Sequence, residues 1–227
     1  MVEAVFFDVG STLIRPCPSV AETMARAAAE RGHALTVRDF ELHMPAMDAY
    51  YEAEYLRDGD FWCSHEGSTA IWLDQYRYVC HLAGIGHDAE GMAAAVNGAY
   101  RRAASWEVYA DVAGCLRALK ERGLALGVVS NWDAELEDLL RDLRLLPYFD
   151  TVVSSAAVGY RKPNPVIFDL ACEQLGVRPG ACAHRPDADG DGAAAAGIRP
   201  VIIDRHGAEP DCPYDRVETL ADIPSVL

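Results

Sequence analysis

Helical and strand patterns alternate from residue 111 to residue 204, and this alternation restricts the fold more than any other feature. Helices are expected at DVAGCLRALKERG, DAELEDLLRDLRLL, NPVIFDLACEQLG and GAAAAG, and strands at LALGVVS, FDTVVSS, ACAH and RPVIID. Such alternation forms right-handed βαβ units, whose strands lie parallel in a sheet with helices on both faces. The earlier run VEAVFF, which ends at Asp8, is typical of a further buried strand, and GSTLIRPCPS after it is expected to form a loop. The expected fold class is α/β.

Before this region the pattern is helical from Ser19 to about Asn97. It is broken at three points that contain glycine, namely Gly32-His33, Asp58-Gly59-Asp60 and Gly84-Ile85-Gly86. We therefore expect an all-helical domain inserted into the sheet domain. The expected division places a Rossmann-like core at residues 1–15 and 99–227, and the helical insert at residues 16–98.

The net charge and the cysteine content argue against several classes of protein. A formal charge of −15 opposes binding to nucleic acid or anionic membranes, since both attract clustered lysine and arginine. The seven cysteines are odd in number and form no CxxC pair, which favours reduced thiols over disulfides. The N-terminal MVEAVFFDVG lacks the basic region of a signal peptide, and no apolar run approaches the length of a membrane span. We therefore expect a cytoplasmic protein without nucleic-acid or membrane partners.

The run DADGDG, from Asp187 to Gly192, resembles the start of a calcium-binding EF-hand loop. Such a loop also needs a bidentate Glu at its twelfth position, where this sequence has Ile198. The sequence therefore argues against calcium, and these carboxylates need another explanation.

Chemically reactive side chains gather at the expected ends of the strands. Asp8 ends the first strand, Ser130 ends LALGVVS, Lys162 lies in the loop after FDTVVSS, and the aspartates of DADGDG follow ACAH. Sheets of this kind bind ligands at the carboxyl ends of their strands. An Asp can attack phosphorus, a hydroxyl and a lysine can hold phosphoryl oxygens, and further carboxylates can bind Mg²⁺. These residue types together favour transfer of an anionic group.

Four motifs in order, FFDVGSTL, VVSNWD, GYRKPNPVIF and the acidic loop before GAAAAGI, resemble those of the haloacid dehalogenase-like hydrolase superfamily over essentially the whole chain. The resemblance implies that the helical insert is a cap domain. It also implies that Asp8 is the nucleophile and that Ser130 and Lys162 bind phosphate, with Asn131 as a further substrate-binding residue. The implied reaction is hydrolysis of a small phosphomonoester through an aspartyl-phosphate at Asp8, with Mg²⁺ as cofactor.

Gly10 departs from the family pattern. The family's phosphatases usually carry a second Asp two residues after the nucleophile, where it serves as general acid and base, and Gly10 has that position. Its backbone carbonyl can still bind metal, but it has no side chain to protonate a leaving group. Loss of this help costs roughly 10²–10⁴-fold in rate, and less when the leaving group is good.

The fourth motif is shortened. Its family spacing aligns with His184 on one side and with Asp189 on the other only if three residues are missing between them. In the family, the missing residues include the Asp that binds the metal directly, and Asp187 is a candidate replacement. The expected Mg²⁺ ligands are therefore Asp8, the carbonyl of Gly10, Asp187 and Asp189, while His184 is expected to end a strand.

These departures leave two other hypotheses open. A metal-free, dehalogenase-like hydrolase would use Asp8 as nucleophile, and the other residues that fit its pattern are Ser130, Asn131, Lys162 and Asp189. The insert, however, has no recognisable arginine–aromatic site for halide. A degenerate member of the family would only bind an anion or a protein partner. The identity of the substrate and the oligomeric state stay open.

Overall fold

The computed structural model describes residues 2–177, 190–205, 207 and 212–227, together with the backbone of residues 181–184. The chain forms two compact units. We call Met1–Arg15 with Val108–Leu227 the α/β unit, and Pro16–Glu107 the helical unit. The sequence-based division placed the second boundary earlier, after residue 98.

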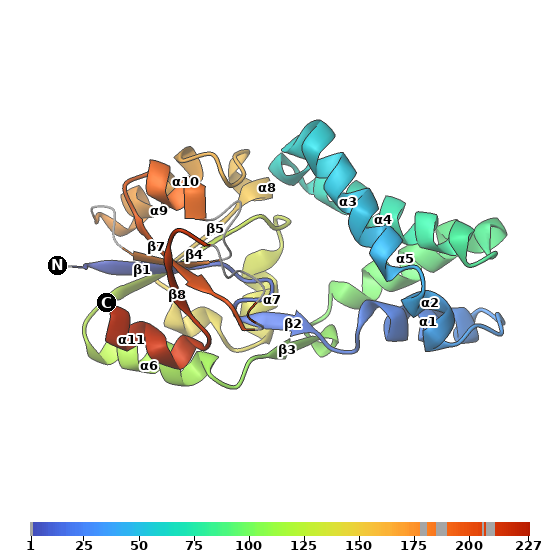
Figure 1. Ribbon diagram of the computed structural model, residues 1–227, viewed down its shortest axis with the longest axis horizontal. Helices are drawn as coiled ribbons and strands as arrows, with labels where there is room; N and C mark the ends of the chain where they lie inside the picture. Colours follow the sequence, from blue (N-terminus) through green and yellow to red (C-terminus); the bar gives the residue numbers. More distant parts are fainter. Residues whose placement is uncertain (1, 178–180, 185–189, 206, 208–211) are drawn as a thin grey trace. The chain divides into compact units, whose positions relative to one another are not determined.

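A parallel sheet lies at the centre of the α/β unit (Figure 1). Its strands are β1 (Ala4–Phe7), β4 (Ala125–Ser130), β5 (Thr151–Ser154), β6 (Ala181–His184), β7 (Arg199–Ile203) and β8 (Asp215–Val217). Their order is β5-β4-β1-β6-β7-β8, and every neighbouring pair is parallel. All residues of β1 are buried, as expected for the central strand of a sheet covered on both faces.

Helices cover both faces of this sheet. They are α6 (Val112–Glu121), α7 (Leu136–Asp142), α8 (Ser155–Val158), α9 (Val166–Leu175), α10 (Asp191–Ala195) and α11 (Ile223–Val226), with short 3₁₀ helices η4 (Leu146–Tyr148) and η6 (Leu220–Asp222). Figure 1 shows α9 and α10 over one face and α6 and α11 over the other. The predicted α/β class with a parallel, Rossmann-like sheet is confirmed.

A buried cluster joins the sheet to α9. It contains Phe6 of β1, Val129 of β4, and Phe168 of α9. In β4, a Cβ added at Gly127 would lie 2.5 Å from the ring of Phe6 and 2.9 Å from the methyl group of Thr151. Only glycine therefore fits where β4 passes Phe6.

Gly127→Ala is expected to lower the free energy of unfolding by about 1–3 kcal/mol, because the added methyl group overpacks this cluster. The matched control is Gly114→Ala, since Gly114 is exposed in α6 and an added Cβ there has no neighbour within 4 Å. The free energy of unfolding of this control is expected to rise by up to about 1 kcal/mol, because alanine has a higher helix propensity than glycine. Urea denaturation of both variants measures the difference, and equal effects at the two positions would contradict the packing argument.

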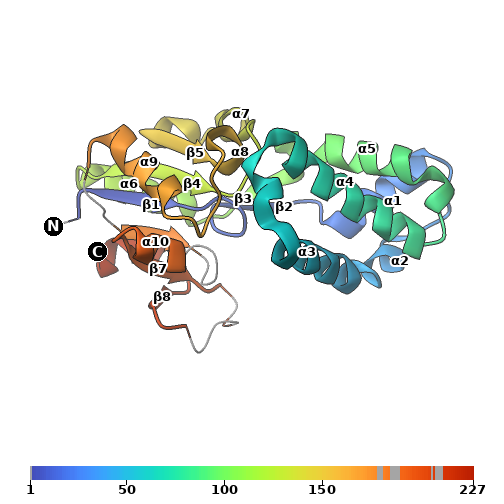
Figure 2. The same cartoon turned by 90° about the horizontal axis from the view of Figure 1, so that it is seen from above.

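The helical unit consists of α-helices and short 3₁₀ helices. These are α1 (Val20–Glu30), α2 (Val37–Glu41), α3 (Met44–Asp58), η1 (Gly59–Cys63), α4 (His65–Leu82), η2 (Gly86–Asp88), α5 (Ala89–Tyr100) and η3 (Ala103–Ser105). The three predicted breaks fall after α1, after α3 and after α4, so they are confirmed. Figure 2 shows α3, α4 and α5 within this unit. The secondary-structure elements described between Val20 and Ser105 are all helices.

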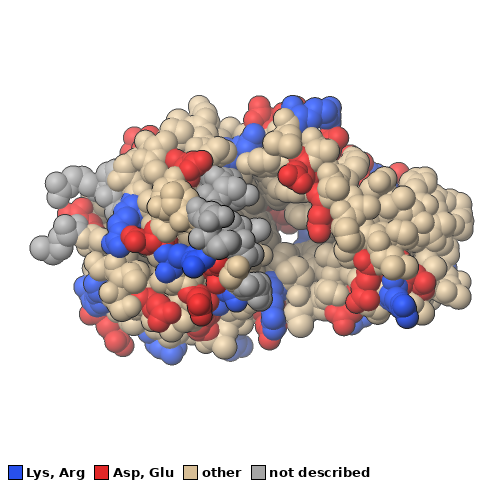
Figure 3. Space-filling view, viewed as in Figure 1, with Lys and Arg blue, Asp and Glu red and all other residues tan. Residues whose placement is uncertain are grey.

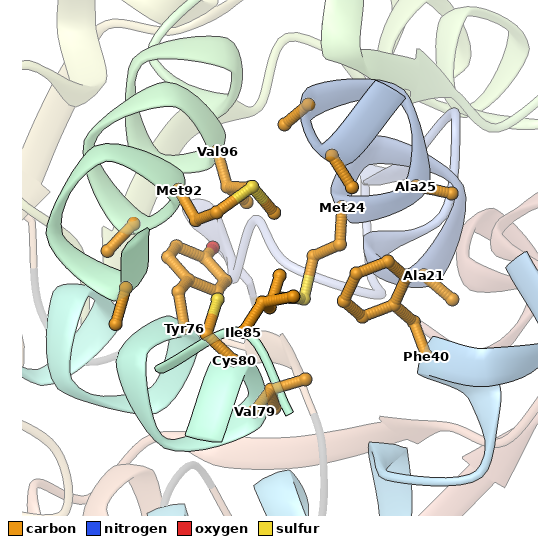
Figure 4. Close-up of a cluster of buried hydrophobic side chains, with 14 of the residues drawn as sticks. Ala21, Met24, Ala25, Phe40, Tyr76, Val79, Cys80, Ile85, Met92 and Val96 are labelled. Carbon is orange, nitrogen blue, oxygen red and sulfur yellow. The ribbon is translucent and has the colours of Figure 1, made fainter. Parts of the chain in front are cut away.

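The core of the helical unit joins four of its helices (Figure 4). Met24 of α1, Phe40 of α2, Tyr76 of α4 and Met92 of α5 are buried in one cluster. At the start of α1, Ser19 forms a capping box, in which its Oγ accepts from the N–H of residue 22 and its own N–H donates to the carboxylate of that residue. This cap supplies partners for backbone groups at the beginning of the helix. The unit therefore has its own core and a defined first helix.

Two short strands, β2 (Ile14–Pro16) and β3 (Trp106–Val108), pair with each other where the chain passes between the two units. The prediction that GSTLIRPCPS forms only a loop is wrong at its centre, because β2 begins there. The partner of β2 lies far along the chain, so the local sequence pattern carries no sign of the pairing.

None of the helices in the described part of the chain combines the length and the apolar character needed to cross a membrane. The six cysteines that the structure describes carry free thiols. Burial raises the pKa of Cys80 and Cys172 to about 11 and that of Cys115 to about 12. These three thiols therefore stay protonated near neutral pH.

Candidate active site

Asp8 follows β1 directly, at the carboxyl edge of the sheet. β1 lies between β4 and β6, with Phe7 in register with Val128 of β4 and with Ala183 of β6. Because the strands are parallel, the carboxyl end of β4 reaches the same edge, and Ser130 lies there. Asp8 is 8% exposed, so its carboxylate is nearly buried at the centre of this edge.

Ser130 and Lys162 donate hydrogen bonds to the same oxygen of Asp8. Ser130 Oγ lies 2.9 Å from Asp8 Oδ1, and Lys162 Nζ lies 2.8 Å from it. Lys162 Nζ also donates to the carbonyl oxygen of Val129, at 3.1 Å. The lysine side chain is 3% exposed, so its charge is balanced by Asp8 where water screens poorly. The structure thus brings together three predicted site residues that are far apart in the sequence.

Asn131 follows Ser130 and contacts the backbone of Lys162. Its Oδ1 accepts a hydrogen bond from the N–H of Lys162 at 2.8 Å, and its Nδ2 donates to the carbonyl oxygen of Lys162 at 3.1 Å. The predicted substrate-binding residue therefore lies in the same group of side chains. Both polar ends of its amide contact the lysine backbone.

Gly10 lies two residues after Asp8 in a tight loop. The carbonyl oxygen of Val9 accepts hydrogen bonds from the three successive N–H groups of residues 12–14, at 3.3, 2.9 and 3.1 Å. A Cβ added at Gly10 would lie 3.4 Å from the ring of Trp132, at the edge of ordinary van der Waals contact. The loop therefore has room for a Cβ atom at this position.

Two of the four predicted magnesium ligands, Asp8 and Gly10, lie in the described part of the chain, and Asp187 and Asp189 lie outside it. For His184, the structure places the backbone at the end of β6. Within the described ranges, no group of three or more His, Cys, Asp or Glu side chains could hold a metal ion. Mg²⁺ needs only one or two carboxylates when water and a substrate phosphate complete its shell. Asp8 and the carbonyl of Gly10 fit part of such a shell.

One charged group beside the loop after Asp8 escaped the sequence analysis. Nη1 and Nη2 of Arg205 donate to the carboxylate of Asp111 at 2.7 and 3.1 Å, and Nη2 also donates to the carbonyl oxygen of Thr12 at 2.9 Å. The guanidinium carbon lies 3.9 Å from the ring centre of Tyr109. These contacts tie the loop to the beginning of α6. Charged residues are exposed by default, and Arg205 and Asp111 are far apart in the sequence. The sequence therefore carries no signal that they pair.

Asp111 accepts further hydrogen bonds from Thr219 Oγ1 at 2.7 Å and from the N–H of Leu220 at 2.9 Å. Burial acts to raise the pKa of Asp111, but the hydrogen bonds from Arg205, Thr219 and Leu220 outweigh it and hold this pKa below its ordinary value. A folded-state pKa below the unfolded value means that the carboxylate stabilises the fold above pH of about 4. That stabilisation is lost as the pH falls through the folded-state pKa.

Asp111→Asn is expected to lower the free energy of unfolding by about 1–3 kcal/mol at pH 7, because Arg205 loses its charged acceptor. The loss is expected to shrink below pH of about 4, where protonation removes the same charge from the wild type. Denaturation in urea at pH 7 and pH 3 measures both values. The control is Asp169→Asn, at an exposed position of α9. Its free energy of unfolding should stay within about 0.5 kcal/mol of the wild-type value at both pH values. A loss independent of pH would contradict the role of the charge.

The comparisons with known proteins agree on one family. The family model of the haloacid dehalogenase-like hydrolases matches residues 2–198. Haloacid dehalogenase-like hydrolase domain-containing protein 3 from Mus musculus is 33% identical over 210 residues, which cover 90% of this chain and 82% of that protein. Glyceraldehyde 3-phosphate phosphatase from Methanopyrus kandleri is 31% identical over 241 residues, with coverages of 98% and 97%.

A solved structure supports the same assignment at the level of the fold. The magnesium-bound HAD-hydrolase YfnB from Bacillus subtilis matches with a TM-score of 0.80 at 15% identity, covering 100% of this chain and 98% of that one. The family match spans both compact units and includes Asp8, Ser130 and Lys162. The chain therefore belongs to the haloacid dehalogenase-like hydrolases and is a hydrolase.

Proposed function

We propose that the protein is a magnesium-dependent phosphatase that hydrolyses a small phosphomonoester through an aspartyl-phosphate on Asp8. The observation that carries this proposal is the convergence of Ser130 Oγ and Lys162 Nζ on Asp8 Oδ1. A carboxylate beside a hydroxyl and an ammonium group suits attack on an anionic group, because both donors can bind the transferring oxygens. The similarity to a glyceraldehyde 3-phosphate phosphatase supports a phosphate ester as the substrate class.

The proposed reaction has two displacement steps. Both donors bind Oδ1 of Asp8, so Oδ2 is the oxygen that would attack phosphorus as the bond to the leaving oxygen breaks. Ser130 and Lys162 hold the phosphoryl oxygens, and the leaving alkoxide takes a proton from water because Gly10 has no side chain. Water then attacks the phosphorus of the aspartyl-phosphate, which releases inorganic phosphate and returns the carboxylate.

In this proposal Asp8 and the carbonyl oxygen of Gly10 would hold Mg²⁺, and Asp187 and Asp189 would be further ligands. The ion supplies positive charge to the phosphoryl oxygens when it is bound. Lys162 adds a second positive charge at the same edge of the sheet. Together they would offset the cost of bringing a phosphate next to the carboxylate of Asp8.

The substrate is proposed to be small and anionic. On the face of the α/β unit drawn in Figure 3, lysine and arginine are interspersed with aspartate and glutamate. With a net charge of −15, the protein must hold an anion through local donors rather than through its overall field. The helical unit is proposed to act as the cap, a role that the family resemblance implies.

Phosphate release from a generic aryl phosphate, with magnesium and then with a chelator, tests this function. An aryl phosphate has a good leaving group, so it tolerates the missing acid at Gly10. Turnover is expected to need magnesium and to fall on the order of 10⁴-fold in Asp8→Asn, which loses the nucleophile. Asp169→Asn is the control and should keep wild-type turnover.

The phosphatase proposal would be overturned if the protein releases no phosphate either with magnesium or with the chelator. Release of halide from a 2-haloacid without metal would then favour the dehalogenase-like reaction, which needs no acid at Gly10. Asp8→Asn would abolish that reaction as well, because both hypotheses use the same nucleophile.

A further inference from the structure

The side chain of Asn131 holds the backbone of Lys162 at two points. Its Oδ1 accepts from the N–H of Lys162 at 2.8 Å, and its Nδ2 donates to the carbonyl oxygen of Lys162 at 3.1 Å. One primary amide therefore satisfies both polar groups of that residue's main chain. Among the side chains, only those of Asn and Gln offer a donor and an acceptor in this arrangement.

The other end of Lys162 is held by residues that precede Asn131 in the chain. Nζ donates to the carbonyl oxygen of Val129 at 3.1 Å and to Asp8 Oδ1 at 2.8 Å, and Ser130 Oγ shares that oxygen. The end of β4 thus contacts the lysine at its backbone and at its ammonium group. A lysine side chain has four flexible carbons, so the position of Nζ depends on where its backbone is fixed.

Lys162 lies in the loop between α8 and α9 rather than at the end of a strand. Sheet hydrogen bonds therefore do not set its position, and the amide of Asn131 is a direct link from this loop to β4. Arg161 Nη1 donates to the same carbonyl oxygen of Lys162 at 3.1 Å. A neutral amide donor suits that crowded oxygen, whereas a carboxylate would repel it.

We propose that Asn131 is a positioning residue, whose side-chain amide acts through Lys162 rather than on the substrate. The proposal rests on the phosphatase function proposed above, because it assigns Asn131 a role in placing the cation of that site. It replaces the sequence-based expectation that Asn131 binds substrate. In this role, Asn131 affects the rate only by holding the ammonium group of Lys162 beside Asp8.

A double-mutant cycle on aryl phosphate turnover tests the proposal. Asn131→Ala is expected to lower kcat by about 10–100-fold, because a displacement of the order of 1 Å can cost that much, and to leave KM within about threefold. Lys162→Ala is expected to lower kcat by about 10²–10³-fold. The double variant should match Lys162→Ala within about threefold, since the two side chains act as one unit. Full additivity of the two losses would overturn the proposal.

Asn164→Ala is the matched control for the cycle. Asn164 lies in the same loop, where its exposed side chain accepts from the N–H of Val166 at 3.0 Å. Its loss should change stability without coupling to Lys162→Ala. Coupling of the same size at Asn164 would show that any weakening of the loop mimics the effect, and would overturn the specific role of Asn131.

Amide hydrogen exchange tests the link itself and needs no catalytic activity. Exchange of the Lys162 N–H is expected to be faster in Asn131→Ala and to stay slow in Asn131→Asp, which keeps an acceptor at that position. Asn164→Ala should leave it unchanged. Unchanged exchange in Asn131→Ala would overturn the proposal even if the enzyme is active. A wild type that releases no phosphate but shows the expected exchange would overturn the proposed function alone.

Discussion

A Lys162→Met variant is expected to lose about 3–5 kcal/mol of unfolding free energy at pH 7, because it leaves the carboxylate of Asp8 nearly buried without its cation. The contact that it removes joins Nζ to Asp8 Oδ1 at 2.8 Å between side chains that are 3% and 11% exposed. Ser130 still donates to that oxygen, but a hydroxyl carries no charge to balance it. Denaturation of the wild type and of this variant in guanidinium chloride measures the loss directly.

The double variant Asp8→Asn/Lys162→Met separates the charge from the packing. It replaces the buried pair by neutral groups of similar size, which is expected to restore most of the stability lost in the single variant. Lys120→Met is the matched control, because Lys120 pairs with Asp150 where the two side chains are 33% and 42% exposed. That control should lose less than about 1 kcal/mol. Equal losses from the two lysine variants would contradict a buried, energetically important pair.

The position of Asp8 and Ser130 could be predicted because each ends a strand with a recognisable apolar pattern. β1 and β4 are neighbours and parallel, so their carboxyl ends meet at one edge. Lys162 could be assigned from the sequence only to the loop after the strand FDTVVSS, since it lies beyond α8 and no strand end fixes its position. In the structure, the amide of Asn131 fixes that loop to β4.

Short helices and strands, and contacts between residues far apart in the chain, could not be predicted from the sequence. β2, β8 and α8 have three or four residues each, too few for a periodic pattern, and tertiary contacts decide their conformation. The pair of Arg205 and Asp111 joins residues from opposite ends of the α/β unit's second segment. The helices of the insert could be predicted because the 3.6-residue period is a local signal that glycines interrupt.

Gly10→Asp is expected to raise kcat for alkyl phosphates, whose alkoxide leaving groups need a proton, by about 10²-fold or more. The backbone accepts a Cβ atom at this position, because it would lie 3.4 Å from the ring of Trp132. Aryl phosphates with good leaving groups should gain far less, since their departure needs little help from an acid. Turnover of a series of esters with rising leaving-group pKa measures this, and the variant should show the flatter dependence.

Gly10→Asn is the control that makes this prediction specific. Its side chain has nearly the same size and the same contact with Trp132, but it cannot transfer a proton to an alkoxide. If both variants gain equally, the effect comes from a more rigid loop after Asp8 rather than from acid catalysis. Acid catalysis predicts that kcat rises only in Gly10→Asp, and that its kcat for alkyl esters falls at high pH as the new carboxyl group loses its proton. That result would mean that the wild-type chain keeps the nucleophile and the cation of the site but lacks its proton donor.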